Sequence, residues 1–309
     1  MNDKKFLRAC EFINKHLIDL DVKHAFNSIG SNIFFDFGKK KEIIQNGSKS
    51  SKWEWTIWIG NAPWRISKNG KFIVGSNDHR DIIQTNIQKL IGKHFHSFQF
   101  LSQFLDVAFN FDDGYQITTF FNWFEEDQWL IFIPDGNNIV INCSNYEEIK
   151  NVRKIAKHFP FIENYKELNF PHDERVLTDI TYKNNEHPIF NFENIFSIDL
   201  RFCDWRLERN QDYLIGYTDL YLKNDKDKIY NIMNELIGKK LKKIDVNSFM
   251  EGRFQFEDQY VIKTFACLRL SDQWRLISKK IPSFYAKIPL AEIANGHEND
   301  PKDNEGSSG

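Results

Sequence analysis

The sequence has few cysteines, and they lie far apart. Only four of the 309 residues are cysteine, and none belongs to a C-x-x-C pair. This spacing argues against a zinc ribbon, a thioredoxin-type motif and a dense disulfide scaffold. We therefore expect a reduced, cytoplasmic protein without a metal or a cofactor. The four cysteines are Cys10, Cys143, Cys203 and Cys267.

Long hydrophobic runs are also missing. No stretch of about 18 apolar residues is present, so we expect no membrane-spanning helix and no membrane partner. The chain starts with MNDKKFLRACEFINKH, which holds several charges. It has no apolar run of the length that a signal peptide needs.

The sequence has no excess of positive charge. It contains 41 lysines and arginines against 43 aspartates and glutamates, which gives a formal net charge of −2. Proteins that bind nucleic acid usually present a basic surface. The charge balance therefore argues against a nucleic-acid partner.

Aromatic residues, in contrast, are abundant. Phe occurs 29 times, Trp 8 times and Tyr 10 times, and hydrophobic residues make up 41% of the chain. Aromatic residues are enriched in strands, and this hydrophobic fraction favours a packed core over disorder. The length alone suggests about two domains.

An internal repeat is the most informative feature of the sequence. Residues 109–129 and 254–274 agree at 10 of 21 positions, with a constant offset of 145. Shorter matches upstream keep the same order, so we interpret the chain as a tandem duplication. The predicted parts are a first copy at 1–145, a connecting helix and linker at 146–170, a second copy at 171–290 and a disordered acidic tail at 291–309.

The repeated segment has the pattern of a β-hairpin. Its identities between 109 and 119 fall on every second residue, which is one face of a strand. Asp112-Asp113-Gly114 fits a three-residue loop with glycine in the left-handed conformation, and this loop places Phe109 opposite Ile117. The second copy has Gln259 in place of Gly114. We expect its turn to be strained or of another type.

A helix is predicted before each hairpin. In the first copy Ile83, Ile87 and Leu90 form an apolar stripe that ends at Gly92, and the second copy repeats this pattern. The predicted fold class is α+β, with each copy an antiparallel sheet that packs one helix. Another amphipathic helix is predicted at 146–159.

Several short motifs of the first copy recur in a recognisable order. They are Pro-Trp-Arg-Ile at 63–66, Asn-Gly at 69–70, Leu-Ile-Gly-Lys at 90–93 and Asp-Gly at 113–114. This pattern resembles an uncharacterised family of bacterial α+β domains, some of them encoded near toxin–immunity or phage-defence genes. The second copy keeps Trp205 and Trp274 but lacks the proline, the Asn-Gly turn and the hairpin glycine. The resemblance implies a fold and an immunity- or defence-associated role, and it implies no catalytic residues.

Two groups of residues are candidate metal ligands. His94 and His96 would share one face of a strand, and Asp112-Asp113 and 125–127 would bring carboxylates to hairpin turns. No third ligand accompanies the histidines, and turns select aspartate for backbone reasons. We therefore favour structural roles for both groups.

The densest polar group lies in the predicted linker. His172, Asp173 and Glu174 follow one another there and are the candidate catalytic residues for acid–base chemistry. Ordinary loop charge is the alternative interpretation.

The candidate binding residues are Trp53 and Trp58. They have no aromatic counterparts in the second copy, and tryptophan is a favoured interface anchor. Core packing is the alternative. The lysine runs at 39–41 and 239–243 are solvated faces, or they contact an acidic partner or nucleic acid.

The predicted function is that of a non-catalytic protein-binding protein, of an immunity or phage-defence type. The absence of a recognisable catalytic motif, the duplication and the charge favour it. The alternatives are a hydrolase or nuclease that uses 172–174 and a nucleic-acid-binding module that uses the lysine runs.

Overall fold

The computed structural model describes most of the chain between residues 11 and 287. Within this range it leaves out 12, 46–47, 103–105, 123–127, 133–164, 169–174, 184–186, 194, 202, 223–225, 269–271 and 279–283. The connecting helix predicted at 146–159 and the tail predicted at 291–309 lie outside the described residues.

The first half consists of two antiparallel sheets. A four-stranded sheet has the order β1-β2-β3-β9, and a five-stranded sheet has the order β5-β4-β8-β7-β6. The strands are β1 (Val22–Asn27), β2 (Ile33–Gln45), β3 (Ser48–Ile59), β4 (Trp64–Lys68), β5 (Lys71–Gly75), β6 (Phe95–Phe100), β7 (Val107–Phe111), β8 (Tyr115–Thr119) and β9 (Trp129–Phe132).

The second half repeats both sheets in the same order. Its sheets are β11-β12-β13-β19 and β15-β14-β18-β17-β16, extended by the edge strands β20 and β10 respectively. The strands are β10 (Lys166–Glu167), β11 (Leu177–Lys183), β12 (His187–Phe192), β13 (Phe196–Asp199), β14 (Asp204–Arg209), β15 (Asp212–Gly216), β16 (Leu241–Val246), β17 (Gly252–Phe256), β18 (Tyr260–Phe265), β19 (Asp272–Ser278) and β20 (Phe284–Lys287).

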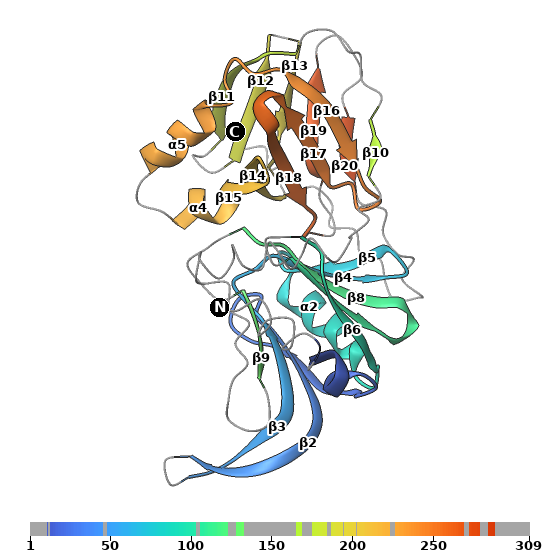
Figure 1. The fold of residues 1–309 in the computed structure, drawn as a ribbon. Coiled ribbons are helices and arrows are strands. Elements are labelled where there is room, and N and C mark those ends of the chain that lie inside the picture. The colour runs from blue at the N-terminus through green and yellow to red at the C-terminus, as the bar shows by residue number, and fades with distance from the viewer. Residues whose placement is uncertain are drawn as a thin grey trace, which may run out of the picture.

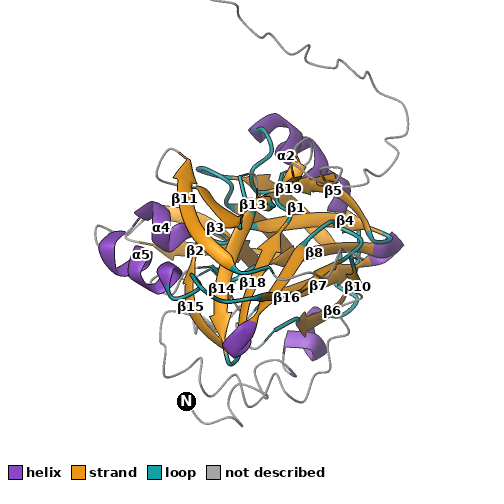
Figure 2. Cartoon of the chain, turned by 90° about the horizontal axis from the view of Figure 1, so that it is seen from above, coloured by secondary structure: helices purple, strands orange, loops and turns teal. Residues whose placement is uncertain are grey.

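Helices make up a small part of the molecule. Strands hold 56% of the described residues and helices 18%. The named α-helices are α2 (Arg80–Ile87) in the first half and α4 (Tyr217–Leu222) and α5 (Lys226–Asn234) in the second. Figure 2 shows them at the periphery, with the strands in the centre.

The prediction of an α+β fold with one helix on each sheet is therefore wrong. The apolar stripe at Ile83, Ile87 and Leu90 does form a helix with a short 3-10 turn, and these side chains are buried. The aromatic strands nevertheless supply most of the core, because in each half two sheets pack face to face. In the first half Phe37 of β2 stacks on Phe111 of β7, with ring centroids 6.5 Å apart. In the second half Phe192 of β12 stacks on Phe256 of β17.

The predicted hairpin is confirmed in the first half, where Phe109 of β7 pairs with Ile117 of β8. Its turn places Asp113 and Gly114 in the left-handed region, with φ of 56° and 72°. The second half uses the same turn without glycine, since Asp258 and Gln259 have φ of 52° and 60°. Of the two outcomes expected for this turn, the strained one is observed.

The two halves stack one above the other, as Figure 1 shows. Equivalent residues of β4 and β14 differ by 141 in number, since Trp64 corresponds to Trp205, and both tryptophans are fully buried. Equivalent residues of β8 and β18 differ by 145. The ends of these four central strands meet between the halves.

Candidate functional site

The contact between the halves has approximate twofold symmetry. Phe120 and Phe265, which are equivalent residues just after β8 and at the end of β18, stack with ring centroids 5.0 Å apart and an interplanar angle of 14°. Both rings are buried. The pseudo-twofold axis therefore passes close to this ring pair.

Two buried arginines bind carboxylates across this axis. Arg206 Nη1 lies 2.8 Å from Asp106, and the equivalent Arg65 Nη1 donates to Glu251 at the matching place. Asp106 and Glu251 are themselves equivalent, and all four side chains are at most 8% exposed. Each half thus supplies an arginine to the other half and receives one in return.

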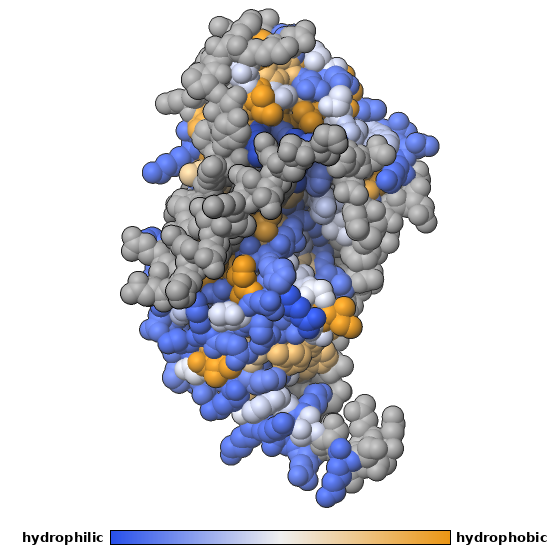
Figure 3. Space-filling view, turned by 180° about the vertical axis from the view of Figure 1, so that it is seen from behind, coloured by the Kyte–Doolittle hydropathy of each residue, from blue (hydrophilic) through white to orange (hydrophobic). Residues whose placement is uncertain are grey.

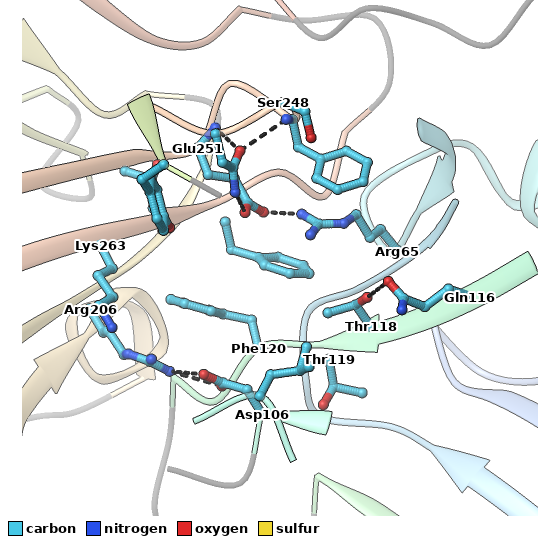
Figure 4. Close-up of a pocket in the computed structure, with 16 residues that line it drawn as sticks. Arg65, Asp106, Gln116, Thr118, Thr119, Phe120, Arg206, Ser248, Glu251 and Lys263 are labelled. Carbon is cyan, nitrogen blue, oxygen red and sulfur yellow. Dashed lines mark hydrogen bonds and ion pairs between the residues drawn. The ribbon is translucent and has the colours of Figure 1, made fainter. Parts of the chain in front are cut away.

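The same arginines lie against the central rings. The guanidinium carbon of Arg65 lies 4.7 Å from the centroid of Phe265, and that of Arg206 lies 4.5 Å from Phe120. Such cation–π contacts are strongest where water is excluded. Figure 4 shows Arg65 and Arg206 entering from opposite sides, with Phe120 between them.

Glycine is required where the two backbones approach each other. A Cβ atom on Gly75 would lie 2.1 Å from the carbonyl oxygen of Cys267, and one on Gly216 would lie 2.7 Å from that of Asn122. Gly75 and Gly216 are equivalent, as are Asn122 and Cys267. Only a residue without a side chain fits these two positions.

A cavity of about 200 Å³ opens beside the axis. Both halves line it, and Figure 4 shows its polar side chains directed inward. The residues that matter for its chemistry are Arg65, Asp106, Gln116, Arg206, Glu251 and Lys263. Ligand sites often form at such interfaces between domains.

The charges around this cavity are paired. Burial disfavours the charged form of Arg206, but the carboxylates of Asp106 and Glu208 outweigh burial and raise its pKa overall. Burial likewise disfavours the charged form of Glu208, but Lys263 and Arg206 together lower its pKa. Arg206 and Glu208 are therefore both ionised at neutral pH.

A second buried polar group lies nearby at the interface. The Cys267 thiol donates to Asp204 Oδ2 at 2.8 Å, and Asn122 Nδ2 donates to Oδ1 at 3.0 Å. Burial raises the pKa of Asp204 to about 6, against the smaller opposing effect of these hydrogen bonds. Burial also raises the pKa of the Cys203 and Cys267 thiols, so neither is a reactive thiolate at neutral pH.

The predicted catalytic residues His172, Asp173 and Glu174 lie outside the described residues. The acidic segment 125–127, a candidate metal-binding group, also lies outside them.

The side chains of His94 and His96 both contact the carboxylate of Asp112. His94 Nδ1 lies 2.6 Å and His96 Nε2 2.7 Å from the two oxygens of Asp112. The hydrogen bond from the His94 backbone N–H, followed by that of its ring, lowers the pKa of Asp112 to about 2.

Within the described residues no group of three or more His, Cys, Asp or Glu side chains has the arrangement of a metal site. The recurring turn aspartates form ion pairs instead. Asp113 lies 2.5 Å from Lys93 Nζ, and the equivalent Asp258 lies 2.5 Å from Lys239 Nζ. These pairs join the hairpin turn to the segment that precedes β6 or β16.

Trp53 and Trp58 are both partly buried. They are five residues apart on β3, so they point to opposite faces of the sheet. Trp58 belongs to a row of apolar side chains across the outer face of the first sheet, whereas the equivalent row of the second half is largely polar. The aligned positions are Phe26, Phe34, Trp58 and Leu130 in the first half and Thr181, Ile189, Asp199 and Arg275 in the second.

Trp53 belongs to a structure that the sequence did not predict. Strands β2 and β3 continue beyond the sheet as a two-stranded ribbon, here called the arm and defined as residues 38–54 (Figure 1). Among the described residues β1 pairs with β2 only up to Phe37, and β9 pairs with β3 only from Thr56. The arm strands therefore pair only with each other there.

The second half has no arm. Phe192 and Phe196, which correspond to Phe37 and Trp55, are separated by three residues, so the first half has 14 more residues at this place. The sequence signal that was overlooked is Asn46-Gly47, because an Asn-Gly pair is a strong sign of a tight hairpin.

Comparisons with family models, with curated proteins and with solved structures find no match to this chain. None of the helices in the described part of the chain combines the length and the apolar character that crossing a membrane requires.

Proposed function

We propose that the protein is a non-catalytic protein-binding protein that docks an acidic partner protein on its arm. The observation that carries this proposal is a projecting basic ribbon that one half has and the other lacks. An immunity or phage-defence role belongs to the same proposal, because such a role is carried out by binding another protein.

The charge of the arm is opposite to that of the rest of the molecule. The arm holds five lysines and two glutamates, a net charge of +3, whereas the rest of the chain has −5. Lys39, Lys40 and Lys41 are exposed. Figure 3 shows the arm as a hydrophilic projection at the lower end of the molecule. A concentrated charge of this kind steers partners of opposite sign.

We expect the arm to contribute little to folding stability. Lys41 and Lys52 stand directly opposite each other in the strand register, and like charges at such positions are destabilising. A single two-stranded ribbon is also only marginally stable in water. A role outside folding therefore accounts best for these residues.

Trp53 supplies an anchor within this charged surface. Its ring is partly buried, and Lys40 Nζ lies 5.6 Å from its centroid. Binding hot spots are typically aromatic residues surrounded by polar groups. Lysines around one tryptophan fit an acidic protein surface with an apolar centre.

The test is binding to proteins encoded beside this gene, measured at several salt concentrations. We expect one of them to bind, with an affinity that falls as salt rises. Replacing Lys40, Lys41 and Lys52 with glutamate should weaken binding at least tenfold. The matched control replaces three exposed lysines of the body, Lys71, Lys89 and Lys183, and should bind normally.

Three results would overturn the proposal. The first is equal weakening by the arm variant and the control variant, which would show that only overall charge matters. The second is a shift of DNA or RNA by the wild type that the arm variant loses, which would favour the nucleic-acid-binding alternative. The third is turnover of a nucleotide or nucleic acid that His172→Ala abolishes, which would favour the hydrolase alternative.

A further inference from the structure

The two halves provide an internal comparison for the outer face of the first sheet. Four apolar side chains stand in one line across this face, each the register partner of the next, and are called the outer row here. They are Phe26, Phe34, Trp58 and Leu130. The equivalent line in the second half contains a threonine, an aspartate and an arginine, at Thr181, Asp199 and Arg275.

The core face of the same sheets has not diverged in this way. The line of side chains one residue away is apolar and buried in both halves. Its members are Ala25, Phe35, Ile57 and Ile131 in the first half and Ile180, Phe190, Ile198 and Leu276 in the second. The fold therefore requires an apolar core face but not an apolar outer face.

The outer row is partly exposed, and its rings are packed against one another. The rings of Phe26 and Phe34 are parallel, with centroids 4.6 Å apart and an interplanar angle of 1°, and that of Trp58 lies 6.5 Å from Phe34. A Cβ atom on Gly60 would lie 2.3 Å from the Trp58 ring, so glycine leaves room for the indole. Contiguous apolar side chains that reach the surface of a protein mark interaction sites.

The carboxylate beside the outer row is already bonded. Asp36 accepts a hydrogen bond from Thr56 Oγ1 at 2.6 Å and lies 3.1 Å from His24 Nδ1. It is only 5% exposed. Phe132 lies in the same line of the register as Thr56 and enlarges the apolar surface towards the arm.

The outer row leads to the basic arm on one face of β3. Lys52 stands six residues before Trp58, so both side chains point to this face, about 20 Å apart at roughly 3.3 Å per residue. Lys52 Nζ lies 5.9 Å from the centroid of Phe132, and Lys41 is the register partner of Lys52. An apolar surface and a pair of lysines thus form one continuous face.

From this arrangement we infer that the outer row and the arm lysines dock one acidic amphipathic helix of the partner protein. Its apolar stripe lies on the outer row, and its acidic residues lie at Lys41 and Lys52. The inference rests on the proposed function and names the part of the partner that binds. A helix of about 13 residues is 20 Å long, and an amphipathic helix on an apolar surface is a recurrent mode of recognition.

Charge distinguishes this helix from the segment that connects the two halves. The amphipathic pattern at 146–159 holds two glutamates against four lysines and arginines, a net charge of +2. The arm has a net charge of +3, and like charges repel. A helix of the opposite sign, from another protein, therefore fits this face better.

The test uses a 14-residue peptide with leucines at helical spacing and glutamate at most other positions. Titration calorimetry should show saturable binding to the full-length protein, with an affinity that falls as salt rises. The matched peptide has lysine in place of each glutamate. It should bind at least tenfold more weakly.

The decisive variant combines Phe26→Thr with Leu130→Ser, which removes apolar surface without a change of charge. It should bind the glutamate peptide at least tenfold more weakly than the wild type. The control Ile277→Ser removes an apolar side chain that is 41% exposed in the second half, and it should bind normally. Leu130→Ser alone replaces the double variant if that variant does not fold.

The inference is wrong if the double variant binds the peptide as tightly as the wild type, or if the lysine peptide binds as well. It is also wrong if the peptide binds only after 146–159 is replaced with a Gly-Ser linker, because the chain itself then covers the row. A neighbouring gene product that the arm variant loses and the double variant keeps would contradict this inference and leave the proposed function standing. If both variants keep that partner, the proposed function fails as well.

Discussion

Single residues show how the two halves have diverged on a shared fold. Gly114 and Gln259 hold the same left-handed position in equivalent turns, with φ of 72° and 60°. Glycine adopts this region without a steric penalty, whereas other L-residues incur about 1–2 kcal/mol. The second half therefore keeps the turn at some energetic cost.

Replacing Gln259 with glycine should raise the free energy of unfolding by about 0.5–1 kcal/mol, because the relief of strain exceeds the added chain entropy. The reverse change, Gly114→Gln, should be destabilising. Its Cβ would lie 1.9 Å from Asn69 Oδ1, in addition to the strain. Urea unfolding of both variants checks these signs, and a destabilised Gln259→Gly would contradict them.

Asp204 should make stability depend on pH. Its folded pKa of about 6 lies above its ordinary value, so its contribution is complete below about pH 4 and is lost as pH rises through 6. Since one pKa unit equals about 1.4 kcal/mol, the loss is on the order of 3 kcal/mol.

The comparison that isolates this effect is wild type against Asp204→Asn, by urea unfolding from pH 4 to pH 7. The advantage of the wild type over the variant should shrink across this range and stay constant above it. A difference that does not change with pH would show that the Asp204 carboxyl is not held neutral by burial.

At the scale of helices and strands, only segments with a clear hydrophobic period could be predicted from the sequence. The hairpin of β7 and β8 was predicted because Phe109, Phe111 and Ile117 alternate with polar residues. The arm was not predicted, because lysine and serine occur on both of its faces, so its apolar residues do not alternate with polar ones. The share of helix was overestimated, because the apolar stripe of Ile83, Ile87 and Leu90 forms only a short helix beside two sheets.

The arm should be dispensable for folding. Replacing 38–54 with Glu-Asn-Ile, the three residues that join Phe192 to Phe196, gives the first half the short connection of the second. The free energy of unfolding should change by less than about 1 kcal/mol, as for surface changes away from the core. A loss of several kcal/mol in denaturant unfolding would mean that the arm supports the sheet.

For the whole molecule, the contact between the halves determines where the candidate sites lie. Its partners are distant in sequence: Arg65 and Glu251 are 186 residues apart, and Arg206 and Asp106 are 100 apart. Such pairs leave no local pattern, so the repeat could reveal two copies but not the interface or its cavity. His172, Asp173 and Glu174 are neighbours in the sequence and lie outside the described residues.

The two cross-half ion pairs should not be equally important. Among the described residues, Glu251→Gln leaves Arg65 without a carboxylate partner, whereas Asp106→Asn leaves Arg206 paired with Glu208. Removing the partner of a buried charge typically costs about 3–5 kcal/mol, so Glu251→Gln should destabilise the protein more. Denaturant unfolding of the two variants measures this order, and equal losses would contradict it.

The most direct test of the central claim, that the two copies form one body around a shared axis, is scanning calorimetry of the full chain. The buried rings, ion pairs and backbone contacts between the halves predict a single transition. Its calorimetric enthalpy should equal its van't Hoff enthalpy. Two separate transitions, one from each half, would contradict the claim.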